Sequence, residues 1–369
     1  MLKTFETENY RTFSDRIIFD LTSKDYAFSN DIIKNGLVNK AIIYGRNAIG
    51  KSSLGLALFD IISHLTDRLV FSKRNYINLK HPDKPAIFKY VFIFNEHEVV
   101  YEYKKKDLHC LLNEKLTVNG DVWVNFNYFS DKDNERYIID KLKGNLNLEL
   151  FDNKISVLKY IYRSTPTNNN SILTKLIKFC EGMLWYRSLS EGNMYMGYMN
   201  GDVQNITDII YENGKLSDFR DFLKENGVNY ELKFMQDDER RHVLYVIFDN
   251  NTKAPFTSLA STGTMALSLF FAWKISSFKK ISFLFVDEFD AFLHYESAEQ
   301  IVKQLNHNSN FQSILTTHNT YLMQNELTRP DCCFLMTEKG IKSLHDSTDK
   351  EIRSIHNVEK MYINGAFSE

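Results

Sequence analysis

The residue spacing with the clearest chemistry is a glycine-rich segment that ends in a lysine and a serine. Residues 45–52 read GRNAIGKS and match G-x-x-x-x-G-K-[ST], the pattern of a phosphate-binding P-loop. An apolar run, Ala41–Tyr44, precedes the loop, and apolar residues recur at helical spacing after it. We therefore expect a strand, a glycine loop and a helix whose free N–H groups face phosphate, rather than a chance match on a glycine turn. Lys51 would reach the β- and γ-phosphates, and Ser52 would hold Mg²⁺. The residues assigned to nucleotide contact here are Gly45, Arg46, Asn47, Ala48, Ile49, Gly50, Lys51, Ser52 and Ser53.

A second candidate segment ends in two adjacent carboxylates. Ile281–Val286 is apolar except for Ser282 and runs directly into Asp287 and Glu288. A buried strand that delivers two acids to the edge of a sheet is typical of the Walker B motif. Asp287 would bind Mg²⁺ directly or through water, and Glu288 would polarise the attacking water. The alternative, an ordinary strand followed by an acidic turn, is disfavoured by the P-loop upstream.

A third segment, between these two, is the small and hydroxyl-rich loop Ser258–Thr264. It opens an apolar helix expected over Met265–Trp273. A serine at a helix start with a glycine close by can bind a γ-phosphate through its hydroxyl and the backbone N–H groups, so Ser261 and Gly263 are candidates. The alternative is a plain helix cap by Ser261 or Thr262, and this loop by itself favours the cap.

A histidine ends the fourth segment. Ser313–His318 predicts a strand, and a helix expected at about 291–306 separates it from the acidic pair. A histidine at a strand end is more often structural than catalytic. The chemistry assigned to His318 therefore depends on the order of all four segments along the chain.

Taken in this order, the four segments resemble the ABC-type ATPase superfamily, in its soluble branch with SMC, RecF-like and OLD-like proteins. Several details are similar to one group, the AAA and OLD-like ATPases of bacterial abortive-infection and anti-phage systems. They are Asn47 in the P-loop, ASTGTMAL at 260–267, DEFDAFLH at 287–294 and THNT at 317–320. The resemblance covers the segments before about residue 103 and after about residue 230, and extends less specifically to the middle.

The resemblance implies roles that the residues alone leave open. Ser261 and Gly263 would be the signature that contacts ATP held on the P-loop of a second copy, and His318 would contact the γ-phosphate and the attacking water. Glu288 and His318 would be the catalytic residues, with ATP and Mg²⁺ as cofactors. Two chains would sandwich each ATP, giving a homodimer and leaving a higher oligomer open. A separate effector protein, a nuclease or a toxin, is the partner this group implies.

Some positions depart from the pattern of the superfamily. Ala48 stands where a glycine is common, and Thr262 and Thr264 replace the usual first glycine and the glutamine of the signature. Small polar residues can still approach a phosphate, so activity is expected. Neither a Q-loop glutamine nor a D-loop aspartate can be assigned.

The expected fold is α/β: an ABC-type ATPase head, a P-loop NTPase with a mixed sheet, flanking helices and an antiparallel β lobe, that carries a mainly helical insert. We expect an N-terminal part of the head at 1–103, a β-hairpin and helical insert at 104–229, and a C-terminal part of the head at 230–369. The pattern predicts strands at Leu2–Phe5, Arg16–Leu21 and Ala86–Phe94, with hairpins about Asn95-Glu96 and Asn119-Gly120 and another hairpin over 232–248. It also predicts a helical stretch from about 145 to 226, in which one helix runs through Ile172, Leu176, Cys180, Met183 and Leu184 and a second helix ends at Gly227. A loop is expected at Pro166 and Asn168–Asn170.

Composition restricts the function classes. The 369 residues carry a net charge of −2, so a strongly basic nucleic-acid surface is not visible in the totals, although a local patch stays open. The four cysteines lack metal-type spacing, which predicts free, buried thiols in a reducing cytoplasm. No membrane segment is expected, because the longest apolar stretches fall far short of a span.

Two functions are compatible with the sequence. The first is a dimeric ATPase that acts as sensor and regulator in anti-phage defence and controls a separate nuclease or toxin. The alternative is a RecF- or SMC-like DNA-repair ATPase that binds DNA, although the long heptads of SMC arms are absent. A fused nuclease is not expected, since only about fifty residues follow His318 and they hold no Asp-x-Asp.

Overall fold

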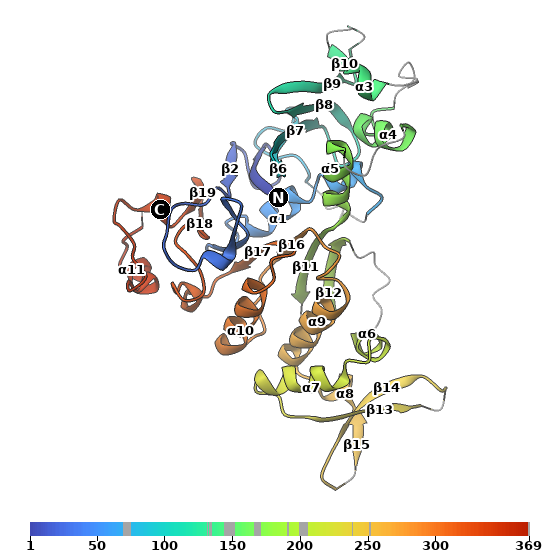
Figure 1. Cartoon of the computed structure of the whole chain (residues 1–369), viewed down its shortest axis with the longest axis vertical. Helices are drawn as coiled ribbons and strands as arrows, with labels where there is room; N and C mark the ends of the chain where they lie inside the picture. Colours follow the sequence, from blue (N-terminus) through green and yellow to red (C-terminus); the bar gives the residue numbers. More distant parts are fainter. Residues whose placement is uncertain are drawn as a thin grey trace.

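The structure is a computed structural model that describes residues 1–68, 75–130, 132, 135–143, 152–165, 171–189, 192–198, 206–237, 239–250 and 252–367. Within these residues the body of the molecule holds two seven-stranded sheets, with a smaller three-stranded sheet at one end (Figure 1). No helix in the described part of the chain is both long and apolar enough to cross a lipid bilayer.

The first large sheet positions three of the four chemical segments. Its strands follow the order β12-β11-β16-β17-β5-β18-β19. The pairs β11–β16, β16–β17, β17–β5 and β5–β18 are parallel, and the two edge strands are antiparallel. The bounds are β5 Lys40–Tyr44, β11 Met183–Leu189, β12 Gly192–Gly197, β16 Phe283–Val286, β17 Gln312–Thr317, β18 Cys333–Thr337 and β19 Gly340–Ser343. Because parallel strands place their carboxyl ends at one edge, the residues that follow β5, β16 and β17 meet there.

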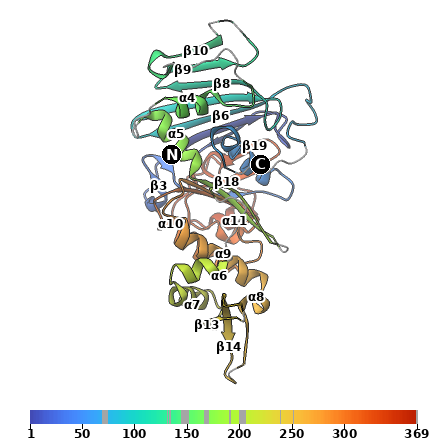
Figure 2. The ribbon, with the colours of Figure 1, turned by 90° about the vertical axis from the view of Figure 1, so that its right-hand side faces the viewer.

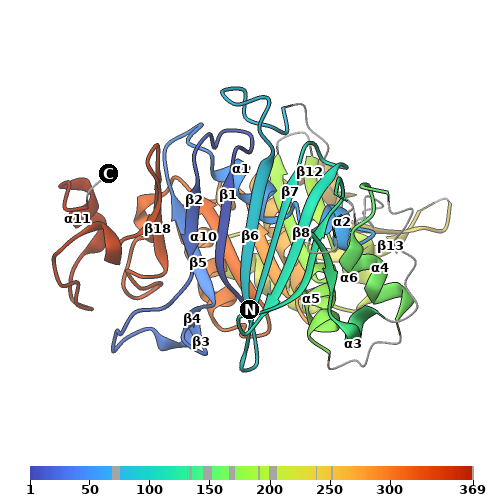
Figure 3. The same cartoon turned by 90° about the horizontal axis from the view of Figure 1, so that it is seen from above.

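The second large sheet is antiparallel and has the order β10-β9-β8-β7-β6-β1-β2. Its strands β2, β1, β6, β7 and β8 run side by side in Figure 3. Buried and half-buried residues alternate along β6, as expected for a sheet with one face on a core. The bounds are β1 Leu2–Glu8, β2 Ile17–Asp20, β6 Ala86–Phe94, β7 His97–Lys105, β8 Leu111–Val118, β9 Asp121–Asn127 and β10 Arg136–Ile138. The hairpins expected at Asn95-Glu96 and Asn119-Gly120 are confirmed.

Helices fill the space between the two sheets and cover the far face of the first one (Figure 2). One core joins the antiparallel sheet, α1, α2, α4, α5 and one face of the first sheet. A second core joins the other face to α6, α7, α9 and α10. The bounds are α1 Lys51–Leu58, α2 Ile62–Leu65, α3 Asp140–Lys143, α4 Val157–Ser164, α5 Ile172–Glu181, α6 Ile206–Glu212, α7 Leu216–Glu225, α8 Phe256–Leu259, α9 Thr262–Ser276, α10 Tyr295–Asn306 and α11 Val358–Ile363.

The remaining strands are small. They are β3 Ile33–Lys34, β4 Leu37–Val38, β13 Glu231–Gln236, β14 His242–Ile247 and β15 Lys253–Pro255. The antiparallel sheet crosses residue 103 without interruption, since β8 to β10 extend the sheet begun by β1 and β6. The division of the chain at residues 103 and 229 stays a prediction.

The prediction of a helical stretch from about 145 to 226 is wrong in part, because β11 and β12 lie within it. Met183 and Leu184 do not continue the helix through Cys180; they begin β11. The reason is Gly182, which caps α5 and whose backbone carbonyl accepts a hydrogen bond from Ser282 N at 2.9 Å. A Cβ at this position would lie 2.9 Å from the same nitrogen, so only glycine lets the chain turn straight from helix into strand. The loop expected at Pro166 and Asn168–Asn170 lies outside the described residues.

A buried ion pair connects the P-loop helix to the antiparallel sheet. Lys105 Nζ lies 2.9 Å from Asp60 Oδ2, and the two side chains are 0% and 1% exposed. The phenols of Tyr76 and Tyr103 also donate hydrogen bonds to Asp60, at 2.8 and 3.0 Å. Because these donors share the carboxylate charge, the segment that follows α1 is fixed to β7.

All four cysteines are free, as expected. Cys180, Cys332 and Cys333 are buried, and Cys110 is half-buried, so the expectation of burial holds for three of them.

Candidate functional site

The loop between β5 and α1 has the backbone that the P-loop motif requires. Gly50 has φ +116° and caps α1, and a Cβ there would lie 2.9 Å from Phe13 Cε1 and 3.0 Å from Thr12 Oγ1. Ala48 has φ +62°, in the left-handed region. This conformation costs a non-glycine residue about 1–2 kcal/mol, which explains why glycine is common at this position.

The P-loop lysine is buried at the mouth of this loop. Lys51 is 5% exposed, and its Nζ donates to the carbonyl oxygens of Gly45 and Arg46 at 2.7 and 3.1 Å. The same Nζ lies 3.1 Å from His318 Nε2, so the first and last sequence segments meet. Burial lowers the pKa of Lys51, while the carboxylates of Glu288 and Asp287 act in the opposite direction. A cation held in this position faces the space where phosphate oxygens are expected.

The first Walker B acid is completely buried with one oxygen unsatisfied. Asp287 is 0% exposed, and its Oδ1 accepts a hydrogen bond from Thr316 Oγ1 at 2.8 Å. Its Oδ2 is buried without a hydrogen-bond partner. A buried carboxylate oxygen with no donor is costly unless a cation satisfies it. Mg²⁺ prefers oxygen ligands, and Ser52 in the first turn of α1 offers a hydroxyl oxygen of this kind.

The second Walker B acid is held in a strained conformation that directs it toward the other polar groups. Glu288 has φ +49°, and its backbone N donates to Thr316 Oγ1 at 2.8 Å. Its Oε2 accepts a hydrogen bond from Arg187 Nη2, and its Oε1 lies 4.0 Å from His318 Nε2. Left-handed backbone at a non-glycine residue is typical of functional sites, where the surroundings fix it.

Two residues of this cluster were not predicted from the sequence. Arg187 belongs to β11, whose Tyr186 lies opposite Val286 in the parallel pair with β16. Its guanidinium therefore lies beside the acids, with Nη1 3.6 Å from Asp287 Oδ2. No sequence signal points to Arg187, because the pattern of its segment predicts helix.

The second missed residue, Thr316, had a usable signal. It precedes Thr317 and His318 in the expected strand, and β17 pairs in parallel with β16 so that Leu315 lies opposite Val286. The residues that follow Leu315 and Val286 are Thr316 and Asp287, which therefore lie next to each other. A hydroxyl one residue before the strand end is thus the natural partner for a Walker B acid.

The signature candidates make contacts of a different kind. Ser261 caps α9, and its Oγ accepts a hydrogen bond from Thr264 N at 3.2 Å. A Cβ on Gly263 would lie 2.6 Å from the carbonyl oxygen of Phe292, which follows Walker B. Within one chain, Ser261 therefore acts as a helix cap of α9. These contacts do not join Ser261 and Gly263 to the cluster around Lys51, and the roles of the site residues toward nucleotide remain predictions.

Within the described residues there is no group of three or more histidine, cysteine, aspartate or glutamate side chains arranged to hold a metal ion. Asp290 instead accepts a hydrogen bond from Thr317 Oγ1 at 2.7 Å, and burial raises its pKa.

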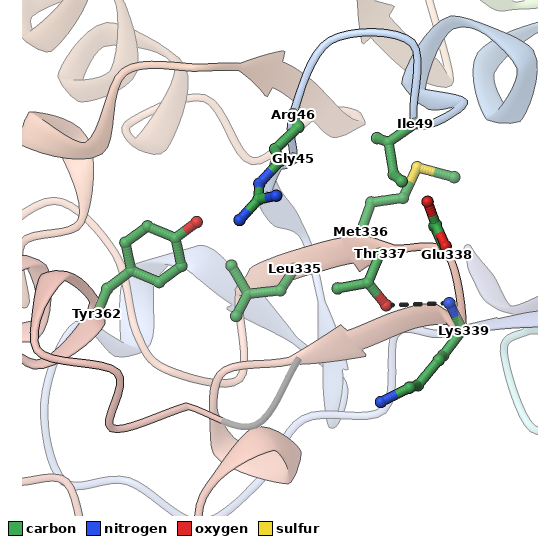
Figure 4. A pocket seen from close by; sticks show the side chains of 9 residues that line it. All are labelled: Gly45, Arg46, Ile49, Leu335, Met336, Thr337, Glu338, Lys339 and Tyr362. Atoms are coloured by element: carbon green, nitrogen blue, oxygen red, sulfur yellow. Dashed lines mark hydrogen bonds between the residues drawn. The ribbon is translucent and has the colours of Figure 1, made fainter.

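A cavity of about 330 Å³ opens beside the start of the P-loop (Figure 4). Its walls come from the P-loop, β18 with the turn after it, and α11: Gly45, Arg46, Ile49, Leu335, Met336, Thr337, Glu338, Lys339 and Tyr362. The ring of Tyr362 faces Leu335 and Arg46 across the space. The P-loop packs closely here, since a Cβ on Gly45 would lie 2.9 Å from the carbonyl oxygen of Met336. The size and the mixed lining suit a small organic ligand.

Comparisons with known proteins give one family and several solved structures. The family model described as "AAA domain, putative AbiEii toxin, Type IV TA system" matches residues 40–324. No curated protein matches the chain. The SMC head domain from Thermotoga maritima is 16% identical, with a TM-score of 0.42 over 93% of this chain and 98% of that one. The SmcHead bound to the C-winged helix domain of ScpA is 14% identical, with a TM-score of 0.47 over 94% and 99%.

The matched range includes the P-loop, the signature candidates, Walker B and His318, and it spans well over half of the 369 residues. The parallel strand order around β5, β16 and β17 agrees with the expected ABC-type P-loop fold. The chain therefore belongs to this family of AAA domains.

Proposed function

We propose that this protein binds and hydrolyses ATP with Mg²⁺, and that two copies form a dimer around the nucleotide. The observation that carries the proposal is the meeting of Lys51, Asp287, Glu288 and His318 at one edge of a parallel sheet. The unsatisfied Oδ2 of Asp287 supports a divalent cation there. Mg²⁺ would be held by Asp287 and Ser52, where it would supply positive charge to the phosphate oxygens.

Each side chain has a task that follows from its contacts. Lys51 would exchange the carbonyls of Gly45 and Arg46 for phosphate oxygens, which are stronger partners because they are charged. Glu288 would orient the attacking water, since its carboxylate is partly exposed and held by its strained backbone. His318, between Lys51 and Glu288, would donate a hydrogen bond to the terminal phosphate.

The cavity beside the P-loop would hold the base and ribose. It begins at Gly45 and Arg46, the residues next to the phosphate position, and the ring of Tyr362 offers a surface on which a base can stack. The nucleotide would then extend from the P-loop toward α11.

The dimer would bring Ser261 and Gly263 onto the nucleotide of the other copy. The start of α9 offers free N–H groups and a serine hydroxyl, which suit a phosphate once a partner presents it. In the cytoplasm, such a dimer would act as a sensor and regulator in anti-phage defence, with ATP binding and hydrolysis controlling a separate nuclease or toxin. The family description, which names a putative AbiEii toxin and a Type IV TA system, supports this setting.

A mixing experiment tests the shared site. Lys51→Ala removes the charge that holds the β- and γ-phosphates, so this variant should neither bind nor hydrolyse ATP. Ser261→Arg should bind ATP but fail to close the dimer, because the bulky cation occupies the phosphate position. In a mixed dimer one composite site carries both lesions and the other carries neither, so activity should return toward one working site per dimer.

Dimerisation is measured alongside ATP hydrolysis, by light scattering with ATP and Mg²⁺. If both sites must act together, the mixture regains the dimer without regaining hydrolysis. Normal closure and normal hydrolysis by Ser261→Arg alone would show that Ser258–Thr264 only caps a helix, and the shared site would be wrong.

A further inference from the structure

Arg187 lies between the two Walker B acids and contacts both. Its Nη2 donates a hydrogen bond to Glu288 Oε2, and its Nη1 is 3.6 Å from Asp287 Oδ2. The second contact is an ion pair without a hydrogen bond, since Asp287 Oδ2 has no hydrogen-bond partner. One guanidinium therefore balances two carboxylates at the end of β16.

The oxygen that Arg187 faces is the same oxygen that suits a divalent cation. Asp287 Oδ1 is already bonded to Thr316, so Oδ2 is the atom left for an incoming cation. Two cations that share one buried carboxylate oxygen repel each other. A divalent ion at Asp287 thus requires the guanidinium to withdraw.

The surroundings of Arg187 permit this withdrawal. Its Nε is buried without a hydrogen-bond partner, so the side chain is held mainly by the two carboxylates. The side chain is 27% exposed, and Glu288 beside it is 28% exposed, which leaves a path toward solvent. Arg187 can keep its bond to Glu288 while it gives up the longer contact with Asp287.

We propose that Arg187 is a resident counter-cation that occupies the metal-binding side of Asp287 in the nucleotide-free protein, and that Mg²⁺ with nucleotide must displace it. The proposal rests on the proposed ATP site and adds a regulatory step to it: the arginine sets the Mg²⁺ concentration at which the site loads. Arg187 is a positioning residue here, since it acts on the two acids.

The test measures loading by thermal stability and does not depend on turnover. The full chain is heated with a fixed concentration of a non-hydrolysable ATP analogue while Mg²⁺ is varied, and the Mg²⁺ concentration giving half of the rise in Tm is recorded. Arg187→Gln keeps hydrogen-bond donors and loses the charge, so the half-point should fall about tenfold or more, in line with the coupling between close charge pairs. Arg187→Lys, which keeps the charge, should stay near the wild-type value.

A matched control and a second readout separate this role from a structural one. Arg220→Gln removes an arginine that pairs with Glu231 at 3.3 Å on the exposed surface, and should leave the half-point unchanged. With a chelator present, Arg187→Gln should melt below wild type, because two carboxylates lose their counter-charge. Saturating Mg²⁺ and nucleotide should close that gap.

Each outcome decides the question. An unchanged half-point in Arg187→Gln, or a variant that stays unfolded at saturating Mg²⁺ and nucleotide, would overturn the proposal and make the arginine structural. If the wild type shows no nucleotide-dependent rise in Tm beyond that of Lys51→Ala, the proposed ATP site itself is wrong. That result is distinct from an unchanged half-point in a chain that does bind nucleotide.

Discussion

Replacing Thr316 with valine should destabilise the protein more than a typical change of this size, although the two side chains have nearly the same shape. The Oγ1 of Thr316 donates to Asp287 Oδ1 at 2.8 Å and accepts from Glu288 N at 2.8 Å. Thr316 is 0% exposed, so water cannot replace either bond. Valine fills the volume and leaves both partners without their hydrogen bond.

The expected loss follows from these two bonds. A hydrogen bond to a charged group contributes about 1.5–3 kcal/mol, and an unsatisfied buried donor costs about 1–3 kcal/mol. The low ends of these two ranges add to about 2.5 kcal/mol. We expect the free energy of unfolding to fall by about 3 kcal/mol, a large share of the roughly 5–15 kcal/mol typical of a folded domain.

Urea denaturation measures this loss, and Thr7→Val provides a matched control. Thr7 in β1 is 1% exposed, and its Oγ1 is buried without a hydrogen-bond partner. Removing that hydroxyl should leave stability unchanged or raise it by about 1 kcal/mol. If the two valine variants differ by less than about 0.5 kcal/mol, Thr316 does not support the Walker B acids and the reasoning fails. A loss for Thr316→Val that disappears in 1 M salt would also contradict it, because the bonds are buried.

Two further predictions concern the cavity and a buried lysine. Tyr362→Ala should weaken ATP binding about tenfold, by removing about 1–3 kcal/mol of stacking, and should leave the affinity for inorganic pyrophosphate unchanged; equal losses for both ligands would place the base elsewhere. Burial lowers the pKa of Lys40 to about 7 from an unfolded value of 10.5. Between pH 7 and pH 10.5 the unfolded chain therefore binds more protons than the folded chain. The free energy of unfolding should rise with pH over this range, by at most about 1.4 kcal/mol per pH unit. Lys40→Met should flatten this rise and stabilise the protein at pH 7, as measured by urea midpoints at pH 7 and pH 9.5; an unchanged slope would assign the pH dependence to other groups.

The parts of the site that local sequence determines were predictable. The strand Lys40–Tyr44, the loop and α1 are contiguous, so motif and periodicity together placed Lys51. The same holds for β16 and Asp287, where an apolar strand runs into its acids. Ala48 shows the limit of a motif: its departure from glycine was visible, and its left-handed backbone was not.

What could not be predicted depends on which strands become neighbours. Arg187 reaches the acids only because β11 pairs with β16, about a hundred residues away along the chain. Met183 and Leu184 continue the apolar spacing of the residues in α5. The helix nevertheless ends at Gly182, which is in close contact with Ser282. A tertiary contact therefore decides a local structure that periodicity assigns to helix.

The ion pair between Asp60 and Lys105 has a consequence for modularity. Asp60 follows the P-loop helix, and Lys105 lies two residues beyond position 103, so a truncation there would leave a carboxylate inside an apolar core without its cation. Breaking such a pair costs about 3–5 kcal/mol, whereas replacing both residues with apolar ones is often neutral. In natural variation the two positions should therefore change together, and the hairpin β6–β7 should be inherited with the P-loop as one unit.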